Sequence, residues 1–150
     1  MAHCGGAPSP GACPGTPSRL TPCNAPIQTF YQAQKFAGMQ TSQARDVYRA
    51  ICSASTPEAA AALGRAAQRD EPEHVRPDWD LVKWEVMRQA LRSKFERHAG
   101  ARALLLSTGE ATLVEDSPHD YVWGVGRDST GGNKLGRFLM QLRDELRQAM

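Results

Sequence analysis

Hydrophobic positions recur at helical spacing along most of the chain after residue 26. Within "TSQARDVYRAICSAS" four apolar residues stand at i, i+3, i+4 and i+7: Ala44, Val47, Tyr48 and Ile51. This spacing predicts an amphipathic helix that buries one face. Thr41 stands directly before it, where a hydroxyl can accept a hydrogen bond from a free backbone N–H of the first turn.

Three other segments are predicted to be helical from their pattern and their end signals. "TFYQAQKFAG" predicts a short helix that ends near Gly38, and "TPEAAAALGRAA" predicts one with Thr56 as its cap and Pro57 at its first position. The longest, "WDLVKWEVMRQALRSKFERHAG", is predicted to begin after Asp78 and to end at Gly100. Its inner stripe is formed by apolar residues: Val82, Val86, Ala90 and Phe95.

The last third of the chain mixes helices with one strand candidate. "ARALLLSTG" predicts a short buried helix that ends at Gly109, and a final helix is predicted from about Asn133. The apolar face of that final helix is formed by leucines and one phenylalanine: Leu135, Phe138, Leu139, Leu142 and Leu146. Between these helices, "ATLVED" is the best strand candidate, because apolar and polar residues alternate in it. The pattern therefore predicts a domain dominated by helices, with two or three short strands.

Residues 1–26 differ in composition from the rest of the chain. They hold six of the ten prolines, three of the four cysteines and no acidic residue, and they offer little apolar area to offset the entropy of ordering the chain. We therefore expect a disordered tail over 1–26 and one domain over 27–150, a length that suits a single core. The tail lacks the apolar segment of a secretory signal. The cysteine spacing fits no common zinc site, so reduced thiols are expected rather than disulfides or metal ligands.

The charge of the chain is nearly balanced. Eighteen Lys and Arg residues stand against 16 Asp and Glu, which gives a net charge of +2. The basic residues alternate with acids and do not form the concentrated basic stripe by which many nucleic-acid-binding proteins hold phosphates. No apolar run approaches the ~20 residues that span a bilayer. Neither a membrane nor unmodified nucleic acid is therefore expected as a partner.

The stretch "HDYVWGVGRDSTGGNKLG", residues 119–136, combines the residue types of a ligand site. Asp120 and Trp123 stand before a run of glycines, which ends at Asn133 where a helix is predicted to begin. Glycines let the backbone approach a ligand closely, and the N–H groups of a helix N-terminus attract phosphate. A tryptophan stacks on a flat ring, and a carboxylate such as that of Asp120 or Glu115 can act as an acid or base. The alternative is a simple connection between elements, with Trp123 in the core.

Two lysines lie among apolar neighbours, Lys35 in "AQKF" and Lys83 in "LVKW". A partly buried lysine has a lowered pKa and can attack an electrophilic carbon. The alternative is a surface lysine whose stem packs on the protein while its ammonium stays in water. The four histidines show neither metal-ligand nor catalytic-triad spacing, so neither a metal nor another cofactor is expected. Trp79, directly after the predicted cap, is expected to pack under the start of the long helix.

Several separated motifs together resemble the NADAR (YbiA-like) family. They are "FYQAQKF", "WDLVKWEVMRQALRSKF", "LLLSTGEATLVEDSPHDYVWGVG" and "GGNKLGRFLMQLRDEL", in the order and spacing of that family, over about residues 27–147. The resemblance implies a compact, helix-rich α+β single domain that hydrolyses an N-glycosidic bond at a ribose. Family members act on ribosylaminopyrimidine 5′-phosphates, the first intermediates of riboflavin biosynthesis, or remove ADP-ribose from guanine in nucleic acid.

The resemblance also implies the residues of the site. The positions that match the pocket lining of the family are Trp79, Asp120, Trp123, Gly124 and Asn133. Lys35 and Lys83 match as well, and the family is thought to use a lysine that attacks the anomeric carbon; which of the two acts here is left open. In the implied reaction a protonated group helps the base to depart, Glu115 or Asp120 stabilises the positive charge at C1′, and Asn133 with the glycines holds the phosphate. No cofactor or metal is implied, and the expected partner is a small ribosylated base or an ADP-ribosylated guanine.

The chain departs from the family pattern at its beginning. Where members carry a Glu-His pair before the "QAQKF" helix, this chain has Gln28 and Thr29, and the β-rich stretch that precedes the pair in the family is not found. Gln28 is expected to line the substrate site, but its amide does not ionise and cannot replace a carboxylic acid as a proton shuttle. We therefore expect an N-terminally truncated domain over 27–150, with a catalytically impaired module that binds ADP-ribose or a nucleotide as the alternative to an enzyme. The expected location is the cytoplasm, with a plastid also compatible.

Overall fold

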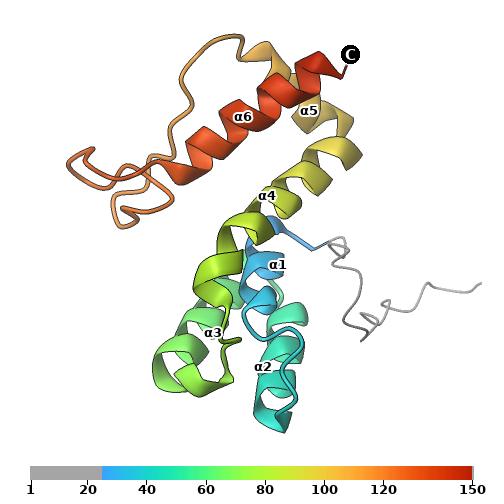
Figure 1. The fold of residues 1–150 in the computed structure, drawn as a ribbon, viewed down its shortest axis with the longest axis vertical. Coiled ribbons are helices and arrows are strands. Elements are labelled where there is room, and N and C mark those ends of the chain that lie inside the picture. The colour runs from blue at the N-terminus through green and yellow to red at the C-terminus, as the bar shows by residue number, and fades with distance from the viewer. Residues whose placement is uncertain (1–24, 150) are drawn as a thin grey trace, which may run out of the picture.

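The computed structural model describes residues 25–149; residues 1–24 and Met150, and with them most of the tail predicted to be disordered, lie outside the described residues. The helices are α1 (Ile27–Gln34), α2 (Ser42–Cys52), α3 (Pro57–Asp70), α4 (Trp79–Arg97), α5 (Ala99–Ser107) and α6 (Lys134–Gln148), with one short 3₁₀ helix, η1 (Pro72–His74). A long irregular loop joins α5 to α6 (Figure 1). The prediction that helices dominate is confirmed.

The helix starts follow the capping residues of the sequence. Thr41 before α2 and Thr56 before α3 each accept a hydrogen bond from the backbone N–H three residues further on, at 3.2 and 3.1 Å. Asp78 precedes α4 as predicted, but its carboxylate does not cap the helix. It forms a two-pronged pair with the Arg76 guanidinium at 2.6 and 2.8 Å instead. The start of α4 is therefore held by a charge pair in the preceding turn.

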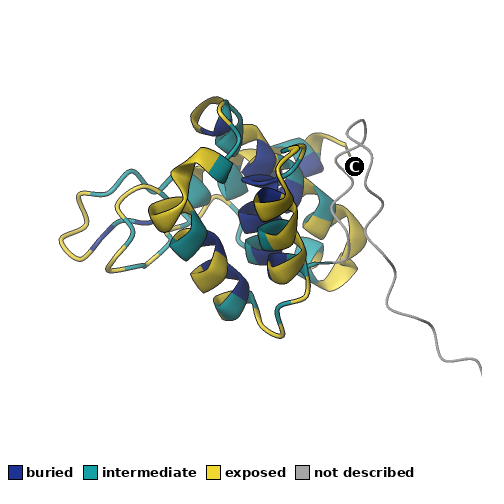
Figure 2. Cartoon of the chain, turned by 90° about the horizontal axis from the view of Figure 1, so that it is seen from below, coloured by how far each residue is buried: buried dark blue, intermediate teal, exposed yellow. Residues whose placement is uncertain are grey.

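Helix α1 forms the centre of the N-terminal part, between α2, α3 and the first turns of α4 (Figure 1). Every residue from 29 to 36 is buried, as expected of a helix surrounded by others. Phe36 and Ile51 are the largest fully buried side chains of this part. Gly64 of α3 lets the two helices approach closely, because a Cβ there would lie 2.8 Å from the Cβ of Gln32. Figure 2 shows the buried residues on the inner sides of the helices.

Helix α4 connects the two parts of the molecule. It packs on α1, α5 and α6, with α1 at its N-terminal end and α5 at its C-terminal end (Figure 1). Of the predicted inner stripe, Val86 and Ala90 are buried, while Val82 and Phe95 are half-buried and pack against the same core. Neither α4 nor any other helix of residues 25–149 combines the length and the hydropathy needed to cross a membrane.

The strand predicted over residues 111–116 is not formed, and no other strand occurs in residues 25–149, so the α+β expectation is not confirmed there. Side chains take up the backbone groups that a neighbouring strand would have paired. The Asn133 amide bonds to the backbone of Leu113 at 2.9 Å and of Glu115 at 3.0 Å. The buried Arg143 guanidinium donates at 2.8 Å to a carbonyl at the start of the segment. The alternation in the sequence therefore marks a segment that lies against α6 without a strand partner.

Two further details of the helix predictions are wrong. The longest helix ends at Arg97 and the next begins at Ala99, because the residue between them is extended. Gly100 therefore lies in the first turn of α5 instead of ending α4. The predicted burial of α5 is also largely absent, since Leu104 is 70% exposed and Leu105 is the buried residue of that helix. Helix α5 is thus a surface helix held by one side.

Candidate functional site

Aromatic rings from four parts of the chain meet where α1, α4 and α6 come together. Tyr31 lies edge-on to Trp79 and Trp123, with ring centroids 5.0 and 5.6 Å away. Trp123 also contacts Trp84 at 5.2 Å and Phe138 at 5.9 Å. We refer to these five rings as the aromatic cluster. Trp79 is buried under the start of α4, while Trp123 and Trp84 are partly exposed and can contact a ligand.

Lys35 reaches the aromatic cluster from the end of α1. Its Nζ lies 5.9 Å from the ring centres of both Tyr31 and Trp79, and it donates to Oε1 of Gln68 on α3 at 2.7 Å. The residue is 4% exposed. Burial, and the nearby positive charge of Arg65, lower the pKa of Lys35 to about 8. Roughly one amine in ten is then neutral at pH 7, against roughly one in three thousand for an ordinary lysine.

Lys83 lies at the outer side of the same cluster. Its Nζ is 2.6 Å from Oδ1 of Asp80 and 5.0 Å from the centre of the Trp84 ring. This ion pair occupies the Lys83 nitrogen, whereas the Lys35 nitrogen donates to an uncharged amide. Lys134, the first residue of α6, places its Nζ 5.8 Å from the same ring. The two lysines of the sequence prediction therefore differ in kind, one buried without a carboxylate partner among the described residues and the other paired at the surface.

The pKa of the Tyr31 phenol is affected by burial and by two nearby carboxylates. Burial raises the pKa of Tyr31 to about 12, the hydrogen bond with the Trp123 side chain works against this, and the carboxylates of Asp120 and Asp80 raise it further. Tyr31 is therefore neutral in the physiological range. The two carboxylates act on the phenol from the loop and from α4, so both face the Tyr31 side of the aromatic cluster.

Asp120 and Gly124 fix the position of Trp123. One carboxylate oxygen of Asp120 accepts from the backbone N–H of Val122 at 2.9 Å and of Trp123 at 2.7 Å. Directly after the tryptophan, the backbone at Gly124 passes so close to the loop that a Cβ would lie 2.7 Å from the Glu115 carbonyl oxygen. Glu115 itself is half-buried and is held through its backbone. These predicted site residues therefore orient one wall of the aromatic cluster.

The beginning of α6 differs from an open anion-binding helix start. The five consecutive backbone N–H groups from Gly131 to Leu135 donate to the five carbonyls of residues 121–125, at 2.7–3.1 Å. The Asn133 amide is also engaged, with its oxygen on Glu115 and its nitrogen on Leu113. These five N–H groups are therefore not available to a phosphate, and side chains are the expected source of its contacts.

Asn133 is expected to contribute strongly to the stability of the loop. Its backbone is left-handed, with φ +46°, and its amide makes the two bonds to the loop. We expect Asn133→Ala to lower the free energy of unfolding by about 3 kcal/mol, because two hydrogen bonds of ~1 kcal/mol each are lost and alanine resists this φ. Asn133→Gly accepts the φ and should cost only the hydrogen bonds. Urea unfolding of both variants checks this, and equal losses would contradict the backbone contribution.

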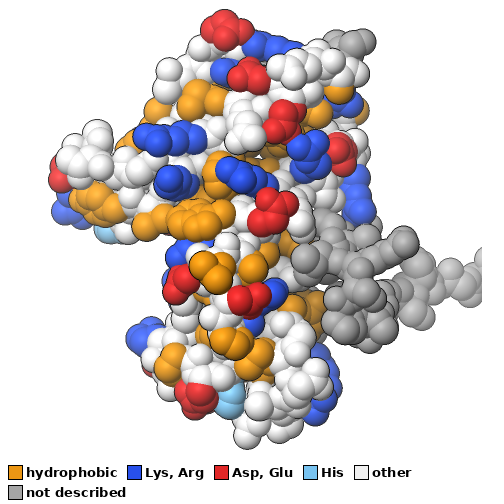
Figure 3. Space-filling view, viewed as in Figure 1, with side chains coloured by type: hydrophobic (Ala, Val, Ile, Leu, Met, Phe, Trp, Pro, Cys, Tyr) orange, Lys and Arg blue, Asp and Glu red, His pale blue; other side chains and the backbone are white. Residues whose placement is uncertain are grey.

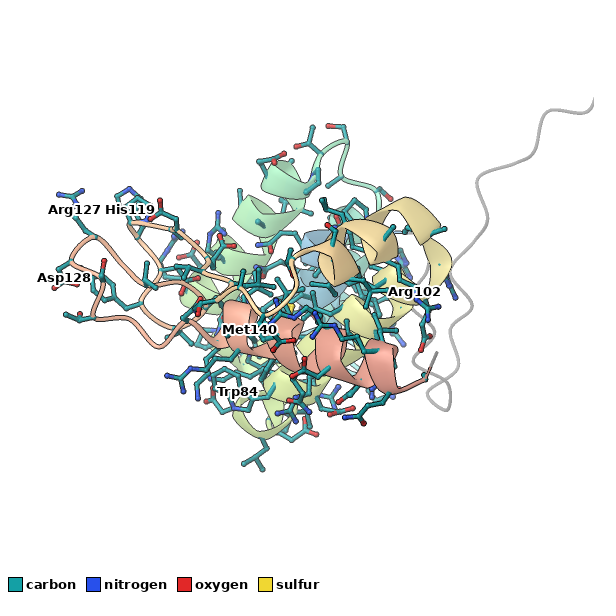
Figure 4. All side chains as sticks on the ribbon, turned by 90° about the horizontal axis from the view of Figure 1, so that it is seen from above. Trp84, Arg102, His119, Arg127, Asp128 and Met140 are labelled. Atoms are coloured by element: carbon teal, nitrogen blue, oxygen red, sulfur yellow. The ribbon has the colours of Figure 1, made fainter. Side chains whose placement is uncertain are left out.

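The remaining predicted residue, Gln28, shares a face of α1 with Tyr31 and Lys35. The three stand at i, i+3 and i+7, and Gln28 is half-buried. The structure thus brings Lys35, Lys83 and the predicted loop residues to one region. It contains no group of three or more metal-binding side chains within the described residues. The outer end of the loop, with His119 and Arg127, lies away from Trp84 (Figure 4).

Sequence reasoning missed part of the site. Tyr31 stands four residues before Lys35, a spacing that already places both on one helix face. Trp84 directly follows Lys83, but its contact with Trp123 depends on the loop. Gln68, the hydrogen-bond partner of Lys35, carries no signal, since it lies 33 positions further along the chain.

The chain matches proteins that share one domain. A protein-family model described as "NADAR domain" matches residues 24–147. The chain is 48% identical over 120 residues to "Riboflavin biosynthesis protein PYRR, chloroplastic" of Zea mays, over 80% of this chain and 19% of that protein. It is 46% identical over 126 residues to "N-glycosidase Npun_R5314" of Nostoc punctiforme, over 84% of this chain and 76% of that protein. The chain thus spans about a fifth of the plant relative and three quarters of the cyanobacterial one.

A solved structure has the same fold. The NMR structure of the E. coli protein YbiA superposes with a TM-score of 0.67 at 42% sequence identity, over 82% of this chain and 67% of that chain. With the family match over residues 24–147, this shows that the chain belongs to the NADAR domain family.

Proposed function

We propose that this chain hydrolyses the N-glycosidic bond between a ribose and a planar nitrogenous base. The observation that carries the proposal is Lys35, a buried amine with a lowered pKa whose Nζ lies 5.9 Å from two rings of the aromatic cluster. Relatives named N-glycosidases support the reaction class. The name of the plant relative, a riboflavin biosynthesis protein, supports a ribosylaminopyrimidine 5′-phosphate as the substrate, with ADP-ribosylated guanine as the second candidate.

Lys35 is the better nucleophile of the two lysines. A nucleophilic amine must be neutral, and burial without a carboxylate partner favours the neutral form. Lys83 is tied to Asp80 at 2.6 Å and is a quarter exposed, so its ammonium is stabilised where it stands. We therefore assign the attack on C1′ to Lys35 and a charge-bearing role to Lys83.

The reaction follows from this assignment. The base packs against Trp123, and the neutral Nζ of Lys35 attacks C1′ while the bond from C1′ to the base nitrogen breaks. The electron pair of that bond leaves with the base, which takes up one proton, and the lysine nitrogen gives up one. Water then adds at C1′, the bond to Lys35 breaks, and the free sugar and the original amine are released. The sum is one water consumed for one glycosidic bond.

Charge at the reacting carbon is stabilised by the loop. C1′ becomes positive as the base departs, and a nearby carboxylate lowers the energy of that state. Asp120 is held by two backbone N–H groups and acts on the Tyr31 phenol, so we assign this role to Asp120, with Glu115 as the second carboxylate of the loop. Gln28, on the same face as Lys35, lines the substrate site together with Trp79, and Gly124 and Asn133 hold the loop in place.

The test is turnover by the purified chain. With a ribosylaminopyrimidine 5′-phosphate we expect release of ribose 5-phosphate, and with ADP-ribosylated guanine we expect release of ADP-ribose if that is the substrate. Gln28→Glu places an ionisable group on the Lys35 face of α1 and is expected to raise kcat at least ~10-fold, since a positioned acid contributes about 10²–10⁴. Gln43→Glu, on the exposed side of α2, is the matched control and should leave kcat unchanged. Folded protein without turnover on either substrate would contradict the proposal.

The second candidate function is a module that binds ADP-ribose or a nucleotide without cleaving it. The amide of Gln28, which cannot shuttle a proton, favours this candidate. Calorimetry would then show ADP-ribose binding that Trp123→Ala weakens, with no product formed. We also propose a cytoplasmic location, with a plastid as the alternative to which the name of the plant relative points.

A further inference from the structure

A phosphate on the ligand needs positive charge from side chains. The N–H groups from Gly131 to Leu135 are all used by the loop, and the Asn133 amide is used as well. Cationic side chains beside the aromatic cluster are therefore the remaining source of charge for an anion whose attached base packs on Trp123.

Two such cations share the ring of Trp84. The ammonium groups of Lys83 on α4 and Lys134 on α6 lie 5.0 and 5.8 Å from its centre. The Trp84 ring in turn lies 5.2 Å from Trp123, so the charged groups are one ring away from the proposed base-stacking surface. Figure 4 shows Trp84 next to α6, and Lys and Arg side chains gather around hydrophobic ones over the region of α4 and α6 in Figure 3.

Two other cations of α4 have different contacts. The Arg88 guanidinium stacks 4.5 Å from the centre of the Phe138 ring, which also belongs to the aromatic cluster but lies further along α4 than Trp84. Arg92 is paired with Glu145 across the small hollow between α4 and α6. Lys134 forms no ion pair with any residue between 25 and 149, and it directly follows the loop that carries Trp123.

Asp80 weakens one of the two cations. Its carboxylate lies 2.6 Å from the Lys83 Nζ and is itself 87% exposed, so the pair can open when a stronger anion arrives. A phosphate dianion would compete with Asp80 for Lys83 and meet no carboxylate partner at Lys134. Removing the charge of Asp80 is therefore predicted to strengthen phosphate binding.

From this arrangement we infer that Lys134 and Lys83, whose ammonium groups both lie near the ring of Trp84, bind the phosphate of a ribose phosphate ligand. The inference rests on the proposed function for the ligand class, because a sugar phosphate is common to both candidate substrates. From the sequence, the phosphate is expected at the start of α6, held by Asn133 and the glycines. The inference places it instead at side chains of α4 and α6. The bound anion is either the terminal phosphate of a ribose 5-phosphate or the diphosphate of ADP-ribose.

The experiment compares ligands that differ only in the phosphate. Binding of ribose, ribose 5-phosphate and ADP-ribose is measured by NMR titration with the whole chain and with Lys134→Gln. We expect Lys134→Gln to weaken ribose 5-phosphate binding about tenfold, the size of one charge-assisted hydrogen bond, and to leave ribose binding unchanged. Lys94→Gln is the matched control, because Lys94 also stands over an aromatic ring on α4, at 5.7 Å from Phe95, but far from the cluster.

Asp80→Asn is expected to change ribose 5-phosphate binding in the opposite direction to Lys134→Gln. Removing this carboxylate should strengthen ribose 5-phosphate binding several-fold, whereas a purely structural role of the Asp80–Lys83 pair would weaken or not change it. If ADP-ribose alone responds to Lys134, the anion is the diphosphate; if ribose 5-phosphate responds, it is the terminal phosphate. Equal binding by Lys134→Gln and Lys94→Gln would overturn the inference, even where the chain turns over its substrate. Lys134-dependent binding without turnover would instead contradict the proposed function and uphold the inference.

Discussion

Replacing Lys35 by methionine is expected to abolish turnover and at the same time to stabilise the folded protein. The variant lacks the nucleophile, so we expect kcat to fall at least ~10³-fold. Methionine has a similar volume and no charge, and Lys35 is 4% exposed without a carboxylate partner among the described residues. Removing the cost of a buried charge should raise the free energy of unfolding at pH 7 by about 3 kcal/mol, since a pKa shift from 10.5 to about 8 corresponds to that free energy.

The pH dependence of this gain has a definite sign. The pKa of Lys35 is lowered from 10.5 to about 8 in the folded chain. Between these values the unfolded chain binds a proton that the folded chain does not, so the stability of the unchanged protein rises with pH there. Below about pH 8 both states are protonated and the full penalty is present. The advantage of Lys35→Met should therefore be constant below about pH 8 and vanish towards pH 10.5.

Turnover of the unchanged protein should follow the same titration. Because the neutral amine attacks, kcat/KM is expected to rise tenfold per pH unit below about pH 8 and to level off above it. Lys83→Met should change KM more than kcat, and Lys94→Met should change neither. Urea unfolding across the pH range and initial rates measure both effects. Loss of kcat in Lys83→Met with retention in Lys35→Met would reverse the assignment of the nucleophile.

The starts of α2 and α3 were predictable because capping is local. Thr41 and Thr56 bond to backbone groups three residues away, so a short segment contains all the information. The strand over 111–116 failed for the opposite reason. Whether an alternating segment becomes a strand depends on a partner strand, and here the Asn133 amide, 18 to 20 residues further on, occupies the backbone groups.

The same distinction between local and long-range information applies to the candidate site. Lys35 and Trp123 could be proposed from residue type and neighbours, because a lysine among apolar residues and a tryptophan before glycines are unusual. The role of the glycine turn could not, since the N–H groups of a helix start are free only if no carbonyl reaches them. In this fold the carbonyls of residues 121–125 reach all five of them from Gly131 to Leu135, and only the path of the loop determines that.

Gly136→Ala is expected to destabilise the domain more than any other glycine-to-alanine change in a helix of the described chain. Gly136 is buried in the first turn of α6. A Cβ there would overlap the Leu113 carbonyl oxygen and lie 2.6 Å from both polar atoms of the Asn133 side chain. These neighbours are a backbone carbonyl and an amide that makes two hydrogen bonds, so they cannot move aside without breaking the hydrogen bonds that hold the loop. We expect the free energy of unfolding to fall by about 3 kcal/mol or more, with loss of turnover as Trp123 is displaced.

Gly100→Ala provides the matched control, because it also adds one methyl group to a helical glycine. Nothing lies within 4 Å of a Cβ at Gly100 in α5, and alanine favours the helix by up to about 1 kcal/mol. The two changes should therefore have opposite signs in urea unfolding. If Gly136 acts through the Asn133 amide, the loss in Gly136→Ala combined with Asn133→Ala should be smaller than the sum of the single losses, since both break the same contact. Additive losses, or a Gly136→Ala protein as stable as the Gly100→Ala one, would mean that α6 does not hold the loop in this way.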